Sequence, residues 1–315
     1  MAVSSEATKI ALPAPAKINL GLRVLGTRAD GYHLIESLMV PVDLHDEVEV
    51  ALVKAPGQVR LALELSLDAA GHTLSDVPAD EENLASRAAR AFLDRAGLDD
   101  GVEIRLVKRI PAAAGLGGGS SDAGAVLRAL CALRPGRLTP LELTQISLAI
   151  GADVPFFLAP RPALVTGIGE QVKPIGGLPA LSLVLANPGE SLATAAVYGA
   201  WDVLAPALTK PQAGSTMRAL SDLRAAESSD FATRSRCLES LLRNDLEPAA
   251  RRLCPPVGQL SRQLAQAGAL AVGMSGSGAT LFGVFEDRQA AEAGLGTLDL
   301  GTSGWGRVAA TEGDG

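Results

Sequence analysis

The chain has 315 residues, 47% of them hydrophobic, and a formal net charge of −7. This length and apolar share allow a sizeable core and favour two domains, while the acidic balance argues against a protein that coats nucleic acid or an anionic membrane. No apolar run is long enough to span a membrane, and three cysteines without paired spacing argue against a disulfide framework or zinc site and favour a cytoplasmic location.

Strand and helix patterns alternate through the first half of the chain. Alternating apolar residues predict strands near residues 18–25, 34–42, 47–53 and 59–67. A helical apolar stripe follows from about residue 83 to 96. This half is therefore predicted to mix helices and strands.

Lys17 and Asn19 open the first of these strands. Side chains alternate along a strand with a period of two, so both are expected on the same side of it. An ammonium beside an amide can clamp anionic or hydroxyl groups. A solvated strand face is the alternative interpretation.

Tyr32 and His33 follow a turn of sequence Arg-Ala-Asp-Gly at residues 28–31. The tyrosine ring can stack on a base, and the histidine can offer hydrogen bonds to its edge. The pair can equally cap the strand that comes next. With only three histidines in the chain, a histidine metal cluster is not expected.

A glycine-rich loop at residues 111–121 separates a predicted strand, 102–108, from a predicted helix, 122–133. Glycines let the backbone turn its N–H groups towards a ligand, and the following helix N-terminus favours an anion. The loop therefore predicts a phosphate site. It is not a Walker A loop, because no Gly-Lys-Ser/Thr closes it. A flexible linker and a weak dinucleotide fingerprint that lacks its third glycine remain as alternatives.

Asp153 follows a second predicted helix, which starts at Thr139-Pro140 and ends before Gly151. A carboxylate between a helix end and the apolar stretch Val-Pro-Phe-Phe needs a partner. One interpretation is a turn or N-cap aspartate. If it instead faces Lys17, the two groups form what a kinase needs, a cation for the transferred phosphoryl group and a base for the attacking hydroxyl.

The second half of the chain begins after a composition change at residues 159–162, Ala-Pro-Arg-Pro, which is the predicted domain joint. A buried strand is predicted at 181–186 and a mostly helical stretch from about 191 to 267. Strands follow at 269–272 and 279–285. Between them the turn Met-Ser-Gly-Ser-Gly either brings backbone close to an anion or is simply a tight turn.

Five segments together carry a family resemblance. They are residues 15–20 (Pro-Ala-Lys-Ile-Asn-Leu), 28–33 (Arg-Ala-Asp-Gly-Tyr-His), 111–121, 151–157 (Gly-Ala-Asp-Val-Pro-Phe-Phe) and 275–279 (Ser-Gly-Ser-Gly-Ala). In this order they resemble the GHMP small-molecule kinases, from about residue 13 to 285. The first two segments are more specific and resemble the members that act on a cytidylyl-linked alcohol in the non-mevalonate isoprenoid pathway.

The resemblance implies a role for each matching position. Asp153 would activate the 2-hydroxyl of the substrate, and Lys17 would orient it and offset charge. The ATP phosphates would be wrapped by Pro111, Ala112, Ala113, Ala114, Gly115, Leu116, Gly117, Gly118, Gly119, Ser120 and Ser121. Asn83 and Lys108 match positions near the adenine. The substrate would be held by Asn19, by Tyr32 and His33 at the cytosine, by Tyr198 as a second stacking ring, and by Thr194 near the alcohol end.

The implied fold is α/β (α+β), with an ATP-binding GHMP kinase domain at residues 1–160 and a C-terminal domain at 161–315. The active site is expected in the interdomain cleft. ATP and Mg²⁺ are the implied cofactors; Mg²⁺ follows from phosphoryl-transfer chemistry, and no residue is assigned to it. The implied partners are ATP and the small-molecule alcohol, with no nucleic acid and no membrane; no oligomeric state is predicted.

Three other functions remain open from the sequence. Another GHMP kinase, acting on mevalonate, homoserine or a sugar, would share the loop but have no use for Tyr32 and His33. A non-catalytic nucleotide-binding regulator would be expected to lack Lys17 or Asp153. A dinucleotide-dependent oxidoreductase is disfavoured because no early strand-Gly-x-Gly-helix unit is present. One departure from the family is Ala-Pro-Arg-Pro at 159–162 in place of a usual Gly-Gly pair, which affects the expected conformation of that loop.

Overall fold

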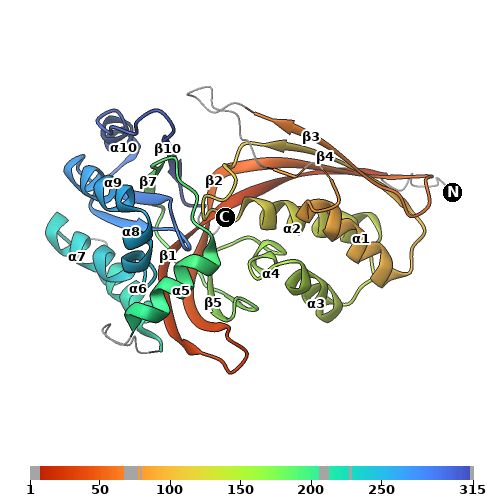
Figure 1. Ribbon diagram of the computed structural model, residues 1–315, viewed down its shortest axis with the longest axis horizontal. Helices are drawn as coiled ribbons and strands as arrows, with labels where there is room; N and C mark the ends of the chain where they lie inside the picture. Colours follow the sequence, from red (N-terminus) through yellow and green to blue (C-terminus); the bar gives the residue numbers. More distant parts are fainter. Residues whose placement is uncertain (1–7, 67–76, 79, 206–212, 227–228, 313–315) are drawn as a thin grey trace. The chain divides into compact units, whose positions relative to one another are not determined.

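The computed structural model describes residues 8–66, 77–78, 80–205, 213–226 and 229–312 (Figure 1). The end of the strand predicted at 59–67 and parts of the helical stretch predicted at 191–267 lie outside the described residues. Among the helices in these ranges, none combines the length and apolarity that a bilayer crossing requires.

The chain forms two compact units that are interleaved in sequence. The first comprises Met1–Ala16, Leu44–Ala112 and Gly117–Pro160, and the second comprises Lys17–Asp43, Ala113–Leu116 and Arg161–Gly315. Residue 160, where the sequence predicts a domain boundary, is one of the points at which the chain changes unit. The segment Lys17–Asp43 is grouped with the second unit because β1 (Lys9–Thr27) and β2 (His33–Val53) are long paired strands that contribute to both units. The segment Ala113–Leu116, from the glycine-rich loop, is also grouped with the second unit.

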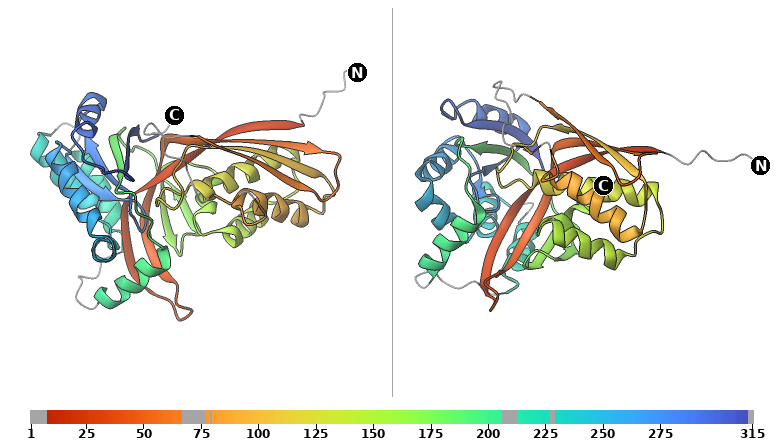
Figure 2. Two further views of the ribbon diagram at one scale, coloured as in Figure 1. Left: turned by 45° about the horizontal axis from the view of Figure 1, so that its top comes forward. Right: turned by 45° about the vertical axis from the view of Figure 1, so that its right-hand side comes forward.

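The first unit places two helices on one face of a sheet (Figures 1 and 2). Strand β4 (Gly101–Lys108) pairs antiparallel with the second part of β2 and parallel with β3 (Val59–Leu65). Helix α1 (Leu84–Ala96) is the crossover that a parallel β3–β4 pair requires, and α2 (Gly118–Leu133) packs beside it. Phe92, Val126 and Leu130 belong to the buried core of this unit.

Local sequence signals fix where the helices of this unit begin and end. Asn83 caps α1 by accepting the Ala85 N–H, and Gly97 ends the helix in the left-handed conformation. Helix α3 (Pro140–Ile150) starts with a capping box between Thr139 and Glu142. A short helix, α4 (Val154–Phe157), follows it.

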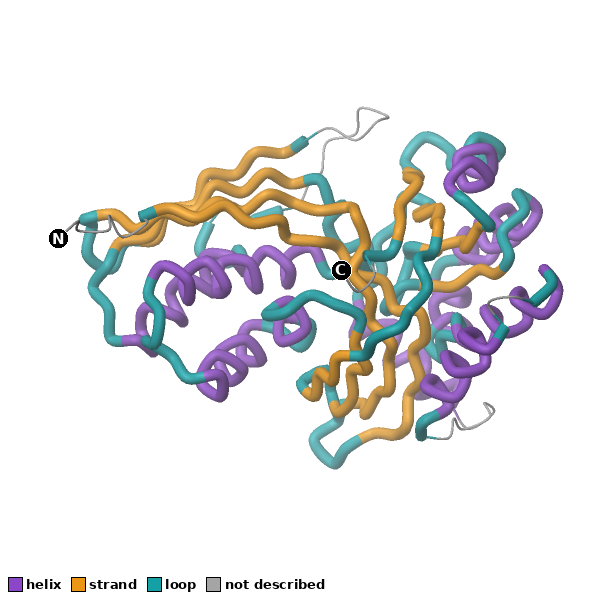
Figure 3. The backbone as a smooth tube through the Cα atoms, turned by 180° about the vertical axis from the view of Figure 1, so that it is seen from behind, coloured by secondary structure: helices purple, strands orange, loops and turns teal. Residues whose placement is uncertain are grey.

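The second unit contains a four-stranded antiparallel sheet in the order β10-β7-β9-β8. Its strands are β7 (Ser182–Asn187), β8 (Ala271–Met274), β9 (Leu281–Phe285) and β10 (Trp305–Ala310). The helices around it, purple in Figure 3, are α5 (Thr194–Leu204), α6 (Ser215–Ala225), α7 (Phe231–Leu241), α8 (Glu247–Leu253), α9 (Pro255–Gln266) and α10 (Arg288–Leu295). Val184, Val257 and Leu281 are part of its core.

The first part of β2 also belongs to the second unit. There it pairs antiparallel with β5 (Ala163–Gly167), which pairs with β6 (Gln171–Pro174). Strands β5, β6 and β10 and helix α10 were not predicted from the sequence. The two strands predicted at 34–42 and 47–53 are in fact one continuous strand, β2. Helix α2 starts at Gly118, four residues before the predicted start, because the helix begins inside the glycine run.

Candidate active site

Lys17 and Asn19 lie on one face of β1 and are both buried, with 3% and 4% of their surface exposed. The Lys17 ammonium donates to Asn19 Oδ1 at 2.6 Å and to the Gly115 carbonyl at 3.1 Å. Asn19 Nδ2 donates to Ser37 Oγ at 2.8 Å. The predicted juxtaposition of the two side chains is confirmed, and the alternative of a solvated strand face is wrong. The structure also brings this pair to the glycine-rich loop, at Gly115.

The second glycine turn, residues 274–278, contacts both Asn19 and Gly115. Ser275 Oγ donates to the Gly115 carbonyl at 2.9 Å, so this carbonyl accepts from both Lys17 and Ser275. The backbone N–H of Gly276 donates to Asn19 Oδ1 at 2.9 Å. The turn is thus joined both to Asn19 and to the glycine-rich loop at Gly115. Whether its backbone also approaches an anion stays a prediction.

Gly115 is required at its position for two reasons. Its φ is +75°, a conformation that other residues rarely adopt, and a Cβ there would lie 2.6 Å from the Ser275 carbonyl oxygen. Replacing Gly115 with Ala is therefore expected to lower kcat/KM by roughly tenfold or more, because the loop must move away from Ser275 and Lys17. Steady-state kinetics with thermal unfolding measures both effects.

Gly136→Ala is the matched control for that substitution. Gly136 has a φ of +74°, but nothing lies within 4 Å of the position its Cβ would take. The control should lose stability by about 1–2 kcal/mol from the same backbone strain and keep its turnover. Equal turnover in Gly115→Ala and Gly136→Ala would contradict the importance of the close approach.

The loop backbone turns repeatedly through the left-handed region. Ala113, Gly115 and Gly117 have φ values of 52°, 75° and 71°. Gly117 is also the N-cap of α2, so the loop leads directly into the positive end of a 16-residue helix. Successive N–H groups in such conformations form an anion-binding concavity, which is the geometry that the sequence predicts for phosphate.

Asp153 occupies the N-cap position of α4, but its side chain makes no capping hydrogen bond. Its turn lies beside the start of α2, because α2 and α4 approach each other closely. A Cβ on Gly124 of α2 would be only 2.5 Å from Phe157 Cβ, and a Cβ on Gly151 would lie 3.8 Å from Ser120 Oγ. Within the first unit, the structure thus brings the predicted base to the end of the predicted phosphate loop.

Helix α5 turns one face towards His33. Its spacing places Thr194, Tyr198, Trp201 and Asp202 on the same side of the helix. The His33 ring stacks on Tyr198 with centroids 4.6 Å apart and meets Trp201 edge-on at 5.5 Å. His33 Nε2 lies 2.8 Å from Asp202 Oδ1. The structure therefore brings together the predicted residues His33 and Tyr198, and it adds Asp202, which holds the imidazole in orientation.

Tyr32 directly precedes His33 in the chain, and Thr194 lies one helical turn before Tyr198 in α5. Tyr32 is 60% exposed, so its ring is presented to solvent and is available for stacking. Thr194 Oγ1 is 3.1 Å from Ser277 Oγ. Since Ser277 belongs to the turn that contacts Asn19 and Gly115, the beginning of α5 is linked to the Lys17 site within the second unit.

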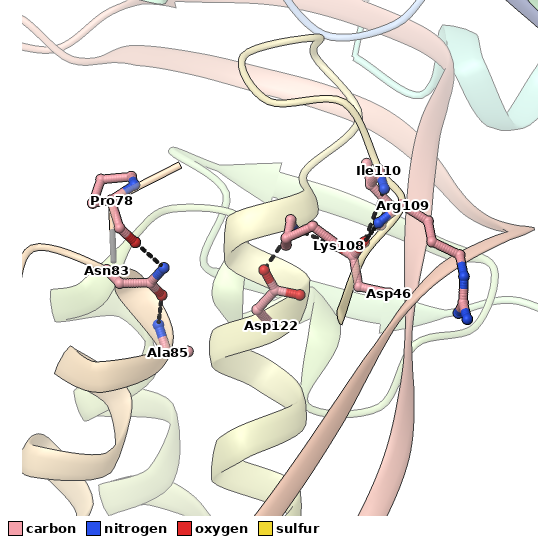
Figure 4. Close-up of polar contacts among 8 residues, drawn as sticks. All are labelled: Asp46, Pro78, Asn83, Ala85, Lys108, Arg109, Ile110 and Asp122. Atoms are coloured by element: carbon pink, nitrogen blue, oxygen red, sulfur yellow. Dashed lines mark hydrogen bonds and ion pairs between the residues drawn. The ribbon is translucent and has the colours of Figure 1, made fainter. Parts of the chain in front are cut away.

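Asn83 and Lys108, predicted near the adenine, both have structural partners (Figure 4). Asn83 accepts the Ala85 N–H at 2.9 Å and donates to the Pro78 carbonyl at 2.7 Å, so its amide shapes the start of α1. The Lys108 ammonium is 3% exposed and pairs with two buried carboxylates, those of Asp46 and Asp122, the second at 2.7 Å.

The buried carboxyl group of Asp122 has an altered acidity. Burial raises the pKa of Asp122 to about 8, Asp46 adds to the rise, and the Lys108 ammonium opposes it. Burial works to lower the pKa of Lys108, and the two carboxylates overcome it, so that this pKa is raised.

Several residues that shape the site were missed by sequence reasoning. Asn244 donates from Nδ2 to two carbonyls of the 274–278 turn, each at 2.8 Å, and so fixes that turn. Asp46, Asp122 and Asp202 complete pairs with residues 62, 14 and 169 positions away. A polar residue within an apolar strand pattern, as at Asp46, was the one available signal.

Comparison with known proteins gives a consistent result. Residues 83–160 match the GHMP kinases N terminal domain, and residues 218–298 match the GHMP kinases C terminal domain. Proteins named 4-diphosphocytidyl-2-C-methyl-D-erythritol kinase are 40% identical in Pelobacter propionicus, over 94% of this chain and 96% of that protein, and 41% identical in Deinococcus radiodurans, over 94% and 91%.

Solved structures agree with this result. A crystal structure of 4-(cytidine 5'-diphospho)-2C-methyl-D-erythritol kinase is 36% identical, with a TM-score of 0.72 over 96% of this chain and all of that one. Mevalonate kinase from L. major shares the fold at 16% identity, with a TM-score of 0.69 over 97% of each chain. The chain belongs to the GHMP kinase family, within the branch whose members are named 4-diphosphocytidyl-2-C-methyl-D-erythritol kinase.

Proposed function

We propose that this protein is the ATP-dependent kinase that phosphorylates the 2-hydroxyl of 4-diphosphocytidyl-2-C-methyl-D-erythritol, in the non-mevalonate isoprenoid pathway. The observation that carries the proposal is the contact of the buried Lys17 ammonium with the Gly115 carbonyl, at 3.1 Å. This contact places a cation beside the loop that is assigned to the ATP phosphates. The names of the relatives at about 40% identity supply the substrate.

The proposed reaction needs one base and one cation. Asp153 takes the proton of the 2-hydroxyl, whose oxygen then attacks the γ-phosphorus of ATP; the bond from that phosphorus to the β,γ-bridging oxygen breaks, and ADP leaves. Lys17 orients the hydroxyl and stabilises the charge that develops on the transferred group. Lys17 and Asp153 belong to different units, and their meeting at one hydroxyl, in an interdomain cleft, is part of the proposal.

The glycine-rich segment from Pro111 to Ser121 is proposed to bind the ATP phosphates through its backbone N–H groups. The family resemblance implies that Asn83 and Lys108 lie near the adenine. Mg²⁺ is proposed to accompany ATP, since phosphoryl transfer commonly uses it and Mg²⁺ takes most of its oxygen ligands from phosphates and water. Among the described residues, no group of three His, Cys, Asp or Glu side chains could hold a metal ion. No protein ligand is therefore assigned.

The cytidylyl part of the substrate is proposed to bind at the aromatic residues of the second unit. Tyr32 and Tyr198 offer stacking surfaces, and His33 offers hydrogen bonds to the cytosine edge. Asn19 holds the substrate near Lys17, and Thr194 lies towards the alcohol end. A cytoplasmic location is part of the proposal and rests on the sequence, in which all three cysteines are present as free thiols.

Tyr32→Ala is expected to raise the KM for the cytidylyl substrate by roughly 5- to 150-fold, equivalent to the 1–3 kcal/mol that stacking on one base supplies. The KM for ATP should change by less than about twofold on the same argument. Leu141→Ala is a suitable control, because it removes another exposed apolar side chain, 67% exposed, on α3. A similar rise in both KM values would reassign Tyr32 to a structural role.

Binding of cytidine nucleotides separates the proposal from other GHMP kinases. Isothermal titration with CDP should give saturable binding to the wild-type protein and weaker binding to Tyr32→Ala. Mevalonate and homoserine contain no nucleobase, so their kinases need no residues that recognise one. Failure of CDP to bind the wild-type protein would remove the specific assignment and leave a GHMP kinase with another alcohol.

A further inference from the structure

Three ionisable side chains meet in the interior of the first unit. Asp46 of β2, Lys108 at the end of β4 and Asp122, the fifth residue of α2, have side-chain exposures of 0%, 3% and 3%. Lys108 Nζ donates to Asp46 Oδ2 and, at 2.7 Å, to Asp122 Oδ2. Figure 4 shows Lys108 between Asp122, which directly follows the glycine-rich segment in sequence, and Asp46, which belongs to β2.

The same cluster holds the chain at the entry to that segment. Asp46 Oδ1 accepts the backbone N–H groups of Arg109 and Ile110, the second at 2.8 Å. These are the two residues between β4 and Pro111. The entry to the loop is thus bound to Asp46, its exit is bound through Asp122, and one ammonium joins the two carboxyl groups.

Packing around the exit leaves little freedom. A Cβ on Gly118 would lie 3.0 Å from Ile110 Cγ2 and 3.3 Å from Lys108 Nζ. The first residue of α2 therefore packs directly on the last residues before the loop. Because the separation of the two ends of the loop is set here, the conformations available to the eleven residues between them are limited.

Buried ion pairs often add little to the stability of a protein. The free energy needed to remove two charges from water is often as large as the free energy of their attraction. Apolar residues of similar volume commonly replace such pairs without loss of stability. A cluster of three buried ionisable groups at the base of a phosphate loop is better explained by a requirement for defined geometry. The raised pKa of Asp122 agrees with its burial and with its position beside a second carboxyl group.

We propose that Lys108, together with Asp46 and Asp122, is a positioning residue that fixes the ends of the phosphate-binding loop, and that its ammonium does not contact the adenine. The proposal rests on the proposed function in one respect, the assignment of residues 111–121 to the ATP phosphates. It replaces the role near the adenine that the family resemblance implies for Lys108.

The test compares two ligands across a set of variants. Binding of ADP and of adenosine is measured by isothermal titration for wild type, Lys108→Met, Asp122→Ala and Asp122→Asn. Hydrogen–deuterium exchange of peptides that cover residues 111–121 reports loop order directly. Asp122→Asn keeps a side-chain oxygen that can accept from Lys108, so it serves as the conservative variant.

Asp100→Asn is the matched control. Asp100 lies just before β4 and pairs with Arg134, at the C-terminal end of α2, through hydrogen bonds of 2.8 and 3.0 Å. This ion pair joins the same two elements at their other ends. Its loss changes stability without changing the separation of the loop ends.

In Lys108→Met and Asp122→Ala, the affinity for ADP should fall by roughly 10- to 100-fold, whereas the affinity for adenosine should change by less than about twofold. The amides of the loop should exchange faster than in wild type. Asp122→Asn should lose less than Asp122→Ala, and Asp100→Asn should behave like wild type in ADP binding and loop exchange. If Lys108→Met fails to fold, Asp122→Ala provides the test, because in that variant Lys108 still pairs with Asp46.

Two results would overturn the proposal. Equal weakening of ADP and adenosine in Lys108→Met would show a contact to the nucleoside, and unchanged ADP binding in both Lys108→Met and Asp122→Ala would show a role in stability only. Failure of the wild-type protein to bind ADP would instead contradict the proposed function, so the two failures are distinguishable.

Discussion

Asp153→Asn is expected to lower kcat by roughly 10²- to 10⁴-fold, the usual contribution of a general base. The amide has nearly the same shape as the carboxylate but cannot take the proton of the attacking hydroxyl. Because the two side chains have the same size, the substitution should leave the fold of that turn intact. ATP binding should persist, with a Kd within about twofold of wild type, since the base acts on the other substrate.

Single-turnover kinetics and ATP titration on the same preparation separate the two effects. Asp94→Asn, at an exposed position on α1 of the same unit, is the matched control and should be fully active. Near-normal turnover in Asp153→Asn would remove Asp153 as the base. A parallel loss of ATP binding and turnover would indicate a structural role for the carboxylate.

Lys17→Met is expected to lower kcat by roughly 10²- to 10³-fold, the usual cost of losing one group that stabilises developing negative charge. Two of the acceptors of the Lys17 ammonium, Asn19 Oδ1 and the Gly115 carbonyl, keep other donors in this variant, which favours retention of the fold. The Gly115 carbonyl still accepts from Ser275, and Asn19 Oδ1 still accepts from the Gly276 N–H. Removal of a buried ammonium also avoids its desolvation cost.

The measurement is kcat together with the midpoint of thermal unfolding. Lys173→Met, on the exposed strand β6 of the same unit, is the control for loss of a lysine charge. We expect Lys17→Met to lose much of its turnover and little of its stability. A variant that retains turnover would contradict a role in phosphoryl transfer, whatever its stability.

Much of the fold could be predicted because its signals are local. Alternation and glycine punctuation identified β4, the loop and the helix after it, and the GHMP kinase fold class with two domains is confirmed by the comparisons. Boundaries were less predictable. Helix α2 begins at Gly118 because Gly117, in the left-handed conformation, lets the chain enter the helix inside a run of residues that resembles a loop.

Strand β2 shows how polar residues within a strand can lead to a wrong prediction of where the strand ends. The sequence predicts a break between residues 42 and 47, where Asp43, His45 and Asp46 interrupt the apolar alternation. The strand continues through them, and Asp46 is fully buried because Lys108 and two backbone N–H groups satisfy its oxygens. Its partner lies 62 residues away, so no local rule could indicate that a carboxylate belongs in the interior.

The candidate site was predictable in its motifs and less so in its contacts. Lys17 beside Asn19 followed from strand periodicity alone. The contact of Lys17 with Gly115, 98 residues away, and the support from Ser275, 160 residues from Gly115, depend on tertiary structure. The assignment of kinase activity is confirmed by the comparisons, whereas the individual roles of the site residues stay predictions.

The most direct test of the central claim is a coupled assay of ADP release with purified protein, ATP and Mg²⁺ across a panel of alcohols. The panel contains 4-diphosphocytidyl-2-C-methyl-D-erythritol, the same alcohol without its cytidylyl group, mevalonate and homoserine. The account predicts release of ADP with the first compound only, lost in Asp153→Asn. ADP release with mevalonate or homoserine at a similar or greater kcat/KM, or none with the cytidylyl alcohol, would contradict it.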